Sequence, residues 1–326
     1  MRKLFTLFVF ASGLLISGKT LGQADFNDLL KGSVADANYL AQGYMEPALN
    51  AIGSGLNQGW YNTAANHKKF GFDLTISVSS LQFPSSERTY FVDNTKLTSI
   101  EIVGDPNAPT FIGSDQAPTY QYKAPASGTF QGPPGVNIQD LPLGGLPIPM
   151  VNLGIGIPWN TDVKFRYGSY SGSGGTKVNL FGFAVQHDIK QHIPGMKELP
   201  FDLSALIGYT TFSSEVGFDS SQPSQIGKAD FSATTIQGLI GKKFSVLTVY
   251  GGVGYNFSSG SFKAQGTYTD SETGVTMVDP VNISSSISGP RVTAGLRLKL
   301  AIFTFHGDYT LQRYNTITLG FGIAVR

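Results

Sequence analysis

Residues 316–325 read TITLGFGIAV, in which apolar side chains alternate with polar or small ones. Successive side chains of a β-strand point to opposite faces, so this alternation gives a strand one lipophilic and one hydrophilic face. The segment therefore predicts a β-strand that meets a different environment on each side. Its lipophilic face would carry Ile317, Leu319, Phe321, Ile323 and Val325.

The two preceding segments, 291–300 and 303–312, repeat the pattern and add charge to the hydrophilic face. A packed protein core does not accept such charges unpaired. The segments also have about the 9–11 residues that a tilted strand needs to cross a bilayer. The charged or titratable residues on their hydrophilic faces are Arg291, Arg297, Lys299, His306 and Asp308.

Two architectures place one face of each strand in an apolar environment. In a soluble β-sandwich the apolar faces meet in a dry centre. In a membrane barrel the apolar faces touch lipid and the charged faces line an enclosed lumen. We expect the barrel, which must be closed because an open sheet edge in hydrocarbon leaves backbone groups unpaired.

The N-terminus reads as an export signal. Residues 1–22 contain Arg2 and Lys3, an apolar run over 4–16, and then small residues, as in a secretory signal peptide. A membrane anchor is the alternative, but the apolar run is shorter than the ~20 residues of a spanning helix. Removal of three bases with this segment lowers the formal charge from +1 to −2. A nearly neutral chain has no electrostatic footprint for nucleic acid.

Residues 23–66 differ from the rest of the chain. They show little alternation, and short apolar groups at helical spacing are interrupted by Pro47 and several glycines. About forty residues cannot form a core alone, and aromatic residues such as Tyr44 and Trp60 argue against a disordered leader. We expect short helices and turns that plug the lumen of a barrel formed by residues 67–326.

Ten segments read as clear strands, beginning with 69–79 and resuming at 150. Residues 80–149 hold 10 of the 17 prolines; 98–103 and 119–123 are candidate strands there, and 131–149 is expected to be loop. Chain ends on the same side of the membrane require an even number of strands. We favour twelve, with ten as the alternative. The clear segments after 150 are 150–157, 161–167, 176–187, 201–212, 231–240, 244–257 and the three closing ones.

Connection lengths give an independent indication of a barrel. The connections at 158–160 and 241–243 are tight, whereas 168–175, 213–230 and 258–288 are longer and rich in Ser and Gly. Short periplasmic turns and long external loops are typical of outer-membrane barrels. Residues 187–200 depart from this rule, because they form a long connection on the side where short periplasmic turns are expected.

Three stretches resemble an uncharacterised family of bacterial outer-membrane barrel proteins: 44–73, which includes Gly59-Trp60-Tyr61-Asn62-Thr63, then 146–167 and 186–202. More remotely, the layout is similar to the fatty-acid and hydrocarbon transport barrels of the outer membrane. Those barrels carry an N-terminal helical hatch and pass apolar ligands sideways into the bilayer. The resemblance implies an all-β fold, a transmembrane antiparallel up-and-down barrel, located in the bacterial outer membrane and admitting small hydrophobic molecules.

The sequence offers little evidence of catalysis or metal binding. His187 and His192 are five residues apart, which is no known ligand pattern, so we expect no metal and no cofactor. Glycines 251, 252 and 254 lie inside a strand rather than before a helix, which disfavours a phosphate loop. His306 and Asp308 share a face, but no nucleophile stands beside a base in the sequence, and we expect no enzyme.

Candidate lumen residues come from the inward faces and from the plug. In segment 176–187 both faces are apolar, so Phe181 and Phe183 either line a lumen for hydrophobic ligands or pack on the plug. The expected partners are membrane lipid and a hydrophobic small molecule, with a monomeric barrel. The candidate lumen residues are Trp60, Phe181, Phe183, Arg166, Arg291, Arg297, His306 and Asp308.

A second function stays open: a non-transporting barrel that acts as a docking or structural component for a secretion or surface-assembly partner. An apolar tunnel, or a gap between strands that faces lipid, would favour transport. A sealed and charged lumen would favour docking.

Overall fold

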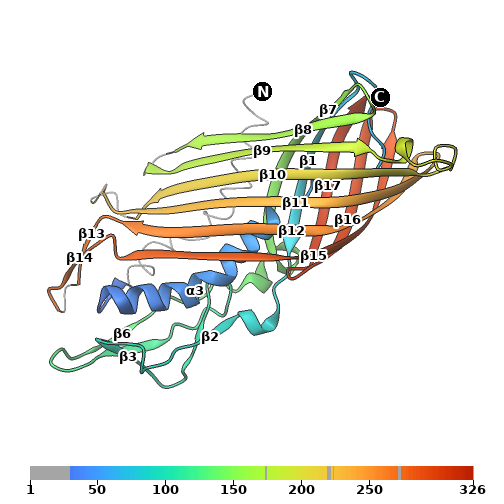
Figure 1. Cartoon of the computed structure of the whole chain (residues 1–326). Helices are drawn as coiled ribbons and strands as arrows, with labels where there is room; N and C mark the ends of the chain where they lie inside the picture. Colours follow the sequence, from blue (N-terminus) through green and yellow to red (C-terminus); the bar gives the residue numbers. More distant parts are fainter. Residues whose placement is uncertain (1–29, 173–174, 219–221, 223, 271–272, 326) are drawn as a thin grey trace.

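Ten strands close into an antiparallel barrel in the computed structural model, which describes residues 30–172, 175–218, 222, 224–270 and 273–325 (Figure 1). The expected signal peptide, residues 1–22, lies outside the described residues. The order around the barrel is β1-β17-β16-β15-β12-β11-β10-β9-β8-β7. The strands are β1 (Phe72–Leu81), β7 (Leu146–Ile157), β8 (Thr161–Ser171), β9 (Lys177–Asp188), β10 (Asp202–Gly217), β11 (Ile226–Phe244), β12 (Leu247–Gln265), β15 (Val281–Leu300), β16 (Phe303–Leu311) and β17 (Thr316–Val325).

The barrel is of the up-and-down type, because each strand pairs with the barrel strands that precede and follow it along the chain. The first strand closes it: Phe72 pairs with Val325 of β17 on one side and with Ile155 of β7 on the other. The predicted architecture is therefore confirmed. The strand number is ten, the alternative, and the favoured number of twelve was wrong.

The two missing barrel strands fall in residues 82–145, which we call the cap. The candidate segments there are strands, β3 (Ile100–Val103) and β5 (Thr119–Tyr122), and they pair with each other. Four residues are too few to cross a bilayer, and the many prolines of this region limit longer ladders. The cap also contains β2 (Thr89–Phe91), β4 (Asn107–Pro109) and β6 (Thr129–Gln131).

One end of the barrel carries both of its chain ends and mostly short connections. Residues 158–160, 245–246 and 301–302 turn there, and residues 189–201 form the one long exception. The cap and residues 266–280, which contain the hairpin β13 (Thr267–Thr269) and β14 (Thr276–Val278), lie at the opposite end. The predicted tight turns at one end are thus confirmed, whereas the connections predicted over 213–230 and 258–288 are shorter than expected because the strands continue into them, and the connection at 312–315 is short.

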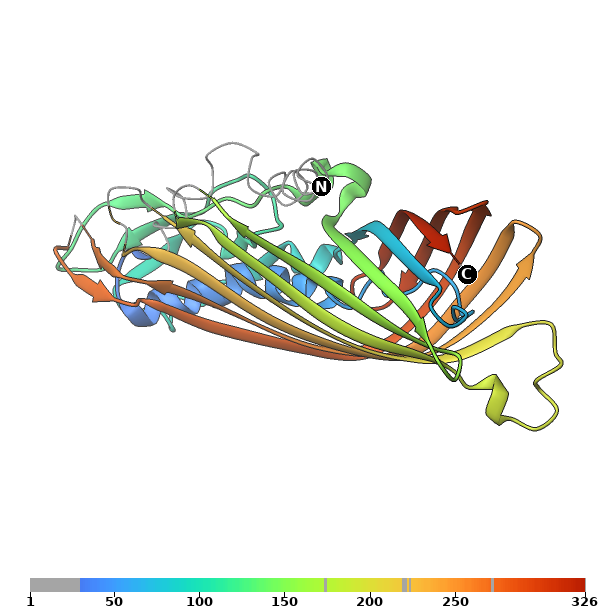
Figure 2. The same ribbon diagram turned by 90° about the horizontal axis from the view of Figure 1, so that it is seen from above.

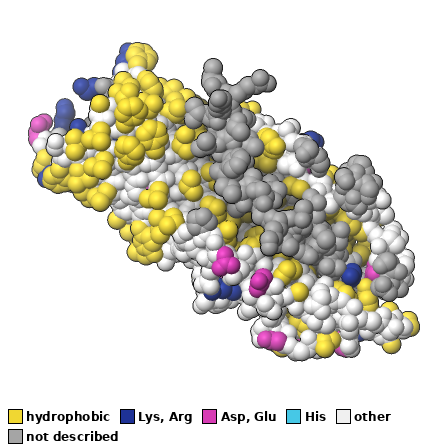
Figure 3. Space-filling model, turned by 180° about the vertical axis from the view of Figure 1, so that it is seen from behind, with side chains coloured by type: hydrophobic (Ala, Val, Ile, Leu, Met, Phe, Trp, Pro, Cys, Tyr) yellow, Lys and Arg dark blue, Asp and Glu magenta, His cyan; other side chains and the backbone are white. Residues whose placement is uncertain are grey.

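The outer face is apolar and the inner face polar, as the alternation predicts. In β17, Leu319 is 54% exposed while Thr316 and Thr318 are fully buried. Leu296 and Phe305, which a sandwich would bury in its centre, are about half exposed, so the sandwich alternative is excluded. Figure 3 shows hydrophobic side chains gathered over the end that carries the two chain ends of the barrel. No helix among the described residues is long and apolar enough to span a membrane.

The barrel wall has uneven height. Strands β10, β11, β12 and β15 have 16 to 20 residues, whereas β1, β16 and β17 have 9 or 10. We call these four long strands the tall wall. Figure 2 shows the helix α3 (Val34–Gly55) lying between the tall wall and the cap. The apolar residues at this junction form one buried cluster, which includes Tyr44, Leu49, Tyr120, Phe231 and Ile283.

The N-terminal segment therefore has two parts. A single 22-residue helix replaces the expected short helices, because Ser33 caps its start and Pro47 is accommodated inside it. The Ser33 hydroxyl accepts a hydrogen bond from the backbone N–H of Asp36. Residues 56–67, which we call the plug loop, then enter the barrel, where Trp60 and Tyr61 are buried in a second apolar cluster with Leu206 and Tyr250.

Candidate functional site

Arg166 fixes the first part of the plug loop. Its side chain is buried on the inner face of β8, and its Nη1 donates to the backbone oxygen of Leu56 at 2.8 Å. Its Nη2 donates to the backbone oxygen of Gln58. The guanidinium carbon lies 3.6 Å from the centre of the Trp60 ring, a cation–π arrangement. Arg166 therefore binds the loop through its backbone and its largest side chain at once.

Two glycines make room for Trp60. A Cβ added to Gly208 of β10 would lie 2.8 Å from the indole Nε1, and one added to Gly182 of β9 would lie 3.1 Å from the ring. Both positions are on the inner faces of their strands. The alternation of the barrel thus leaves a slot in which the indole, 2% exposed, is packed.

A second arginine supports the loop from the far wall. Arg291 of β15 donates from Nη1 to the Asn57 backbone oxygen at 3.0 Å and from Nη2 to Gln58 Oε1 at 2.8 Å. Within the described residues, neither Arg166 nor Arg291 forms an ion pair with a carboxylate. Both guanidinium groups donate to oxygen atoms of the plug loop, so removal of the loop would take these acceptors away. Arg166 would keep Asn152 and Thr210, and Arg291 would keep Thr293 and Thr310.

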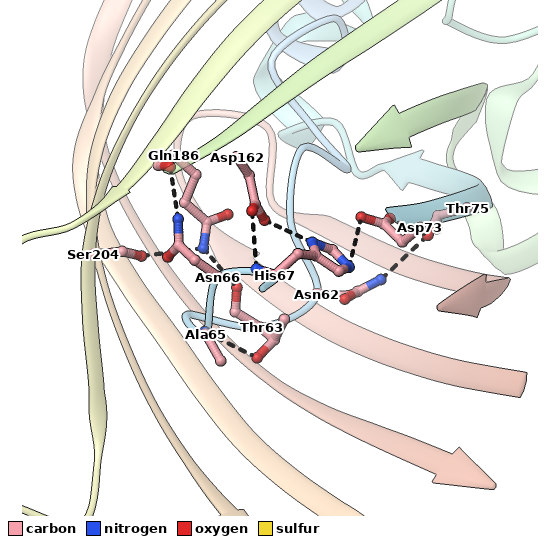
Figure 4. A network of polar contacts seen from close by, with 10 residues as sticks. All are labelled: Asn62, Thr63, Ala65, Asn66, His67, Asp73, Thr75, Asp162, Gln186 and Ser204. Carbon is pink, nitrogen blue, oxygen red and sulfur yellow. Dashed lines mark hydrogen bonds and ion pairs between the residues drawn. The ribbon is translucent and has the colours of Figure 1, made fainter. Parts of the chain in front are cut away.

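The end of the plug loop is held by a buried histidine (Figure 4). His67 donates its backbone N–H to Asp162 at 2.9 Å, its Nδ1 lies 2.8 Å from the other oxygen of Asp162, and its Nε2 lies 3.5 Å from Asp73. Asp162 is on β8 and Asp73 on β1. Nearby, Asn66 donates to the backbone oxygen of Gln186 on β9 at 2.7 Å. The loop is therefore tied to three strands before it joins the barrel wall.

Three further candidate residues lie on the opposite inner wall. Arg297 of β15 and His306 of β16 are buried register partners. Asp308 accepts a hydrogen bond from the Tyr250 hydroxyl at 2.9 Å. A Cβ on Gly320 would clash with the His306 ring, which is therefore packed flat against the neighbouring strand. Within the described residues, no hydrogen bond joins His306 to a serine or threonine hydroxyl.

Phe181 and Phe183 do not line the lumen. They are 52% and 39% exposed on the outer face of β9, and Leu180 and Gly182 point inward instead. Both faces of this strand are apolar, so the alternation could not show which one faces the lumen. The inner face of β9 is apolar as well, because Leu180 packs in the buried cluster formed with α3 and the cap, and Gly182 lies against the indole of Trp60.

The two turn histidines are in contact. His187 Nε2 lies 2.9 Å from His192 Nε2, and the Thr161 hydroxyl lies 2.7 Å from His187 Nδ1. Lys190 closes the same connection by donating to the backbone oxygens of Leu199 and Phe201. The expected structured turn is present. Over the described ranges, no three His, Asp or Glu residues are grouped so that they could hold a metal.

The wall between β7 and β8 is closed along only part of its height. Five residue pairs join the strands, from Ile157 with Thr161 to Leu153 with Phe165. Beyond that point residues 146–152 pair only with β1, and 166–171 only with β9. We call this open part of the wall the seam. Figure 1 shows β7 running with β1 while β8 follows β9 in another direction.

The sequence explains where the seam begins. Pro147 and Pro149 remove two backbone donors from β7, and proline is confined to strand edges because it cannot donate to a ladder. At the base of the seam, the Arg166 Nε donates to Asn152 Oδ1 and bridges the two strands through their side chains. The segment 131–149 was expected to be loop, and that was wrong for 146–149, which pair with β1 despite the prolines.

A closed antiparallel barrel with an apolar outer face and charged inner face belongs to the class of membrane-spanning β-barrels. The chain is a member of DUF6588, a family of unknown function whose sequence model matches residues 1–325. The predicted membership of an uncharacterised barrel family is thereby confirmed. No curated protein matches the chain.

Several solved outer-membrane proteins share the barrel topology at low similarity. Ail, the attachment invasion locus protein of Yersinia pestis, is 10% identical with a TM-score of 0.27, over 79% of this chain and all of that one. The translocator domain of autotransporter NalP from Neisseria meningitidis is 12% identical with a TM-score of 0.33, over 90% and 98%. The outer membrane protease OmpT from Escherichia coli is 10% identical with a TM-score of 0.36, over 79% and 99%. Similarity this remote carries no information on ligand or activity, and the likeness to fatty-acid transporters stays a prediction.

Proposed function

We propose that this protein is a monomeric barrel of the bacterial outer membrane that admits small hydrophobic molecules, and that they exchange with the bilayer through the seam. The single observation behind this proposal is the lateral interruption of the β7–β8 ladder. Hydrocarbon does not satisfy open strand edges, so the open edges of the seam belong at the rim of the apolar outer face. The registers agree, because they connect Tyr167 of the seam through Phe181 and Thr211 to Ser232 and Ser259, where the outer face of the long strands becomes polar. A seam at this place is useful to a molecule that prefers lipid to water.

The surroundings of the seam suit an apolar ligand. On its inner side, Ile148 and Met150 of β7 are buried and apolar. On its outer side, Tyr167 is 72% exposed and borders a hollow of about 340 Å³ that extends away from the seam over β9, β10 and β11, where Phe181 and Thr211 also line it. Arg166, and the plug loop that it holds, lie at the base of the seam. Ile148 and Met150 pack in the buried cluster formed with α3 and the cap, so the proposed sideways route requires α3 to move away from β7.

Covalent bridging of the seam tests the proposal. The chain has no cysteine, so Val151→Cys with Tyr167→Cys creates a unique pair across the seam. Ile155→Cys with Val163→Cys is the matched control, because these residues are paired in the closed part of the wall. Cells of a Gram-negative host that produce each variant are treated with a short bismaleimide. Uptake of the hydrophobic dye N-phenylnaphthylamine is then followed by fluorescence.

The proposal requires that bridging at 151 and 167 lowers dye uptake toward that of cells without the protein. Bridging at 155 and 163 should leave uptake unchanged. Equal uptake before and after bridging of the seam would contradict passage at this place. The cysteine-free parent protein, treated in the same way, controls for modification of other cell components.

A docking role is the second candidate. It is favoured by the part of the lumen that the plug loop fills and seals. Contacts of Arg166, Arg291, His67 and Asn66 hold the plug loop against four strands, β1, β8, β9 and β15. The helix α3 joins the cap to the tall wall. We infer a non-catalytic role for either candidate, because His306 lacks a hydroxyl partner within the described residues. For a docking component, cells with and without the protein should take up the dye equally, whatever is bridged.

A further inference from the structure

On β12, the outer face of the tall wall changes from aromatic to hydroxyl side chains between Phe257 and Ser259. On β12 the outward residues are Val253, Tyr255 and Phe257, and then Ser259 and Ser261. The registers place Ser232 of β11 and Ser286 of β15 on either side of Ser259. The Ser232 and Ser259 hydroxyls are 2.9 Å apart. A band of hydroxyls therefore follows directly after the apolar band, and we call it the hydroxyl belt.

The hydroxyl belt forms a shallow hollow of about 450 Å³. Small side chains create it, since the outward serines of β11, β12 and β15 leave the outer surface lower than the aromatic residues beside it. Serine hydroxyls both donate and accept hydrogen bonds, as sugar hydroxyls do, so the lining matches a carbohydrate. The hollow is lined by Asp230, Phe231, Ser232, Ser259, Gly260, Ser261, Ser284, Ser285 and Ser286.

Two lysines stand directly beyond the hollow. Lys228 of β11 and Lys263 of β12 are register partners on the outward face. Like charges directly opposite each other on neighbouring strands are destabilising, so an anion between them would be favourable. Asp230 lies 3.7 Å from Lys228 and offsets one of the two charges. Glu215 of β10 is the register partner of Lys228 on its other side and pairs with Lys177 at 3.2 Å. Three lysines therefore face two carboxylates, which leaves a net positive charge next to the hydroxyls.

The height of the belt indicates which lipid it meets. Six residues separate Phe257 from Lys263, or roughly 20 Å along a strand and somewhat less along the membrane normal because strands tilt. The headgroup region of an ordinary bilayer is only about 5–8 Å thick on each side. A phospholipid headgroup would reach the first serines and stop short of the lysines, whereas a sugar headgroup spans both.

We propose that the hydroxyl belt, with Lys228 and Lys263, binds the sugar–phosphate headgroup of an anionic glycolipid of the outer leaflet. The serines bind sugar hydroxyls and the lysines bind a phosphate. The site rests on the outer-membrane location, but it is independent of the seam and of any transported molecule. It gives the tall wall a function at the membrane surface.

The test uses the full chain, refolded in a nonionic detergent free of bacterial lipid. Binding of lipopolysaccharide, of the same material after removal of its phosphates, and of phosphatidylglycerol is measured by native mass spectrometry and by titration. Lys228→Gln with Lys263→Gln should weaken lipopolysaccharide binding about tenfold and reduce its salt dependence. Ser259→Leu with Ser286→Leu should weaken binding of the dephosphorylated glycolipid.

Lys242→Gln with Lys243→Gln is the matched control, because these lysines lie at the opposite end of β11. It should leave binding unchanged. Folding of each variant is checked by the shift of the unheated protein in gel electrophoresis. Three results would overturn the proposal: unchanged binding in the Lys228 and Lys263 variant, an equal loss in the control, or phosphatidylglycerol binding as tight as that of lipopolysaccharide.

Discussion

Arg166 shows how a single side chain determines the path of the plug loop. It contacts Leu56, Gln58 and Trp60, which are separated from it by about one hundred residues of sequence. Alternation in β8 places Arg166 on the inner face, so its burial was predictable. Its partners were not, because backbone oxygens of an irregular segment carry no signature in the sequence.

Arg166→Met should free the plug loop. The variant keeps most of the side-chain length but leaves the Leu56 and Gln58 oxygens without their charged donor, which costs about 3 kcal/mol or more. We expect higher and noisier ion conductance in planar bilayers, and easier proteolysis of residues 56–67. Lys177→Met, on an exposed residue of β9, is the control. A conductance equal to that of the parent would show that other contacts hold the loop.

Gly208 tests the slot around Trp60. Because an added Cβ would lie 2.8 Å from the indole, Gly208→Ala should displace the ring and lower stability by about 1–3 kcal/mol. Gly238→Ala is a matched control, since nothing lies within 4 Å of its Cβ position. Tryptophan emission, measured after Trp159→Phe, should shift to longer wavelength only in the Gly208 variant. Identical spectra for both variants would mean that the slot accommodates a methyl group.

At the scale of elements, α3 is attached to the cap through Asp36. Its carboxylate accepts hydrogen bonds from the backbone N–H groups of Thr98 at 2.6 Å and Ser99 at 2.8 Å, and from both hydroxyls. Burial acts to raise the pKa of Asp36, but the hydrogen bonds from Ser99 and Thr98 outweigh it and hold the pKa below its ordinary value. The native state therefore favours the charged carboxylate.

This pKa shift gives a pH dependence of known sign. A carboxyl whose pKa is lowered on folding stabilises the protein above its ordinary pKa, and the contribution is lost as the pH falls through the folded value. Asp36→Asn should weaken docking of α3 by about 2 kcal/mol at neutral pH. The difference between parent and variant should shrink at a pH below the folded pKa. Hydrogen exchange of residues 34–45 measures this effect, with Asp115→Asn as an exposed control.

All ten barrel strands were predictable as strands. Most alternate clearly over the part next to the end with the short turns, as in β17, whereas β9 was recognisable only by its apolar run. The ends of the tall-wall strands next to the cap were not predictable. Residues 213–230 and 258–288 were expected to be loops. The strands continue there through Gly217 and Gln265, and resume at Ile226 and Val281. Serine and glycine on both faces remove the periodic signal. The seam was also beyond prediction, since alternation identifies strands but not how far two neighbours stay paired.

The prolines of β7 can be tested against the seam. Pro147→Val with Pro149→Val returns two backbone donors and favours extension of the β7–β8 ladder beyond Leu153. We expect slower hydrogen exchange in residues 166–171 and lower uptake of the hydrophobic dye. If neither the hydrogen exchange of residues 166–171 nor the uptake of the dye changes, side chains rather than missing backbone donors keep β7 and β8 apart.

At the scale of the whole molecule, the apolar band and the hydroxyl belt together define how the barrel sits in its membrane. Residues of β12 up to Phe257 would contact lipid tails, and those from Ser259 onward would lie outside them. The cap, α3 and the part of the tall wall from Ser259 onward then form one body beyond the bilayer. The turns beside Lys243 lie on the other side, with both chain ends of the barrel.

Single cysteines report this orientation, since the parent chain has none. We expect Ser261→Cys to react with a membrane-impermeant maleimide in intact cells, because it lies beyond the apolar band. Lys243→Cys, at the opposite end of the barrel, should react only after the outer membrane is permeabilised. Val253→Cys should react poorly in both conditions, because a thiol in lipid stays protonated and is not reached by a charged reagent. Labelling of Lys243→Cys in intact cells would reverse the orientation, and rapid labelling of Val253→Cys would show that the apolar face does not meet lipid.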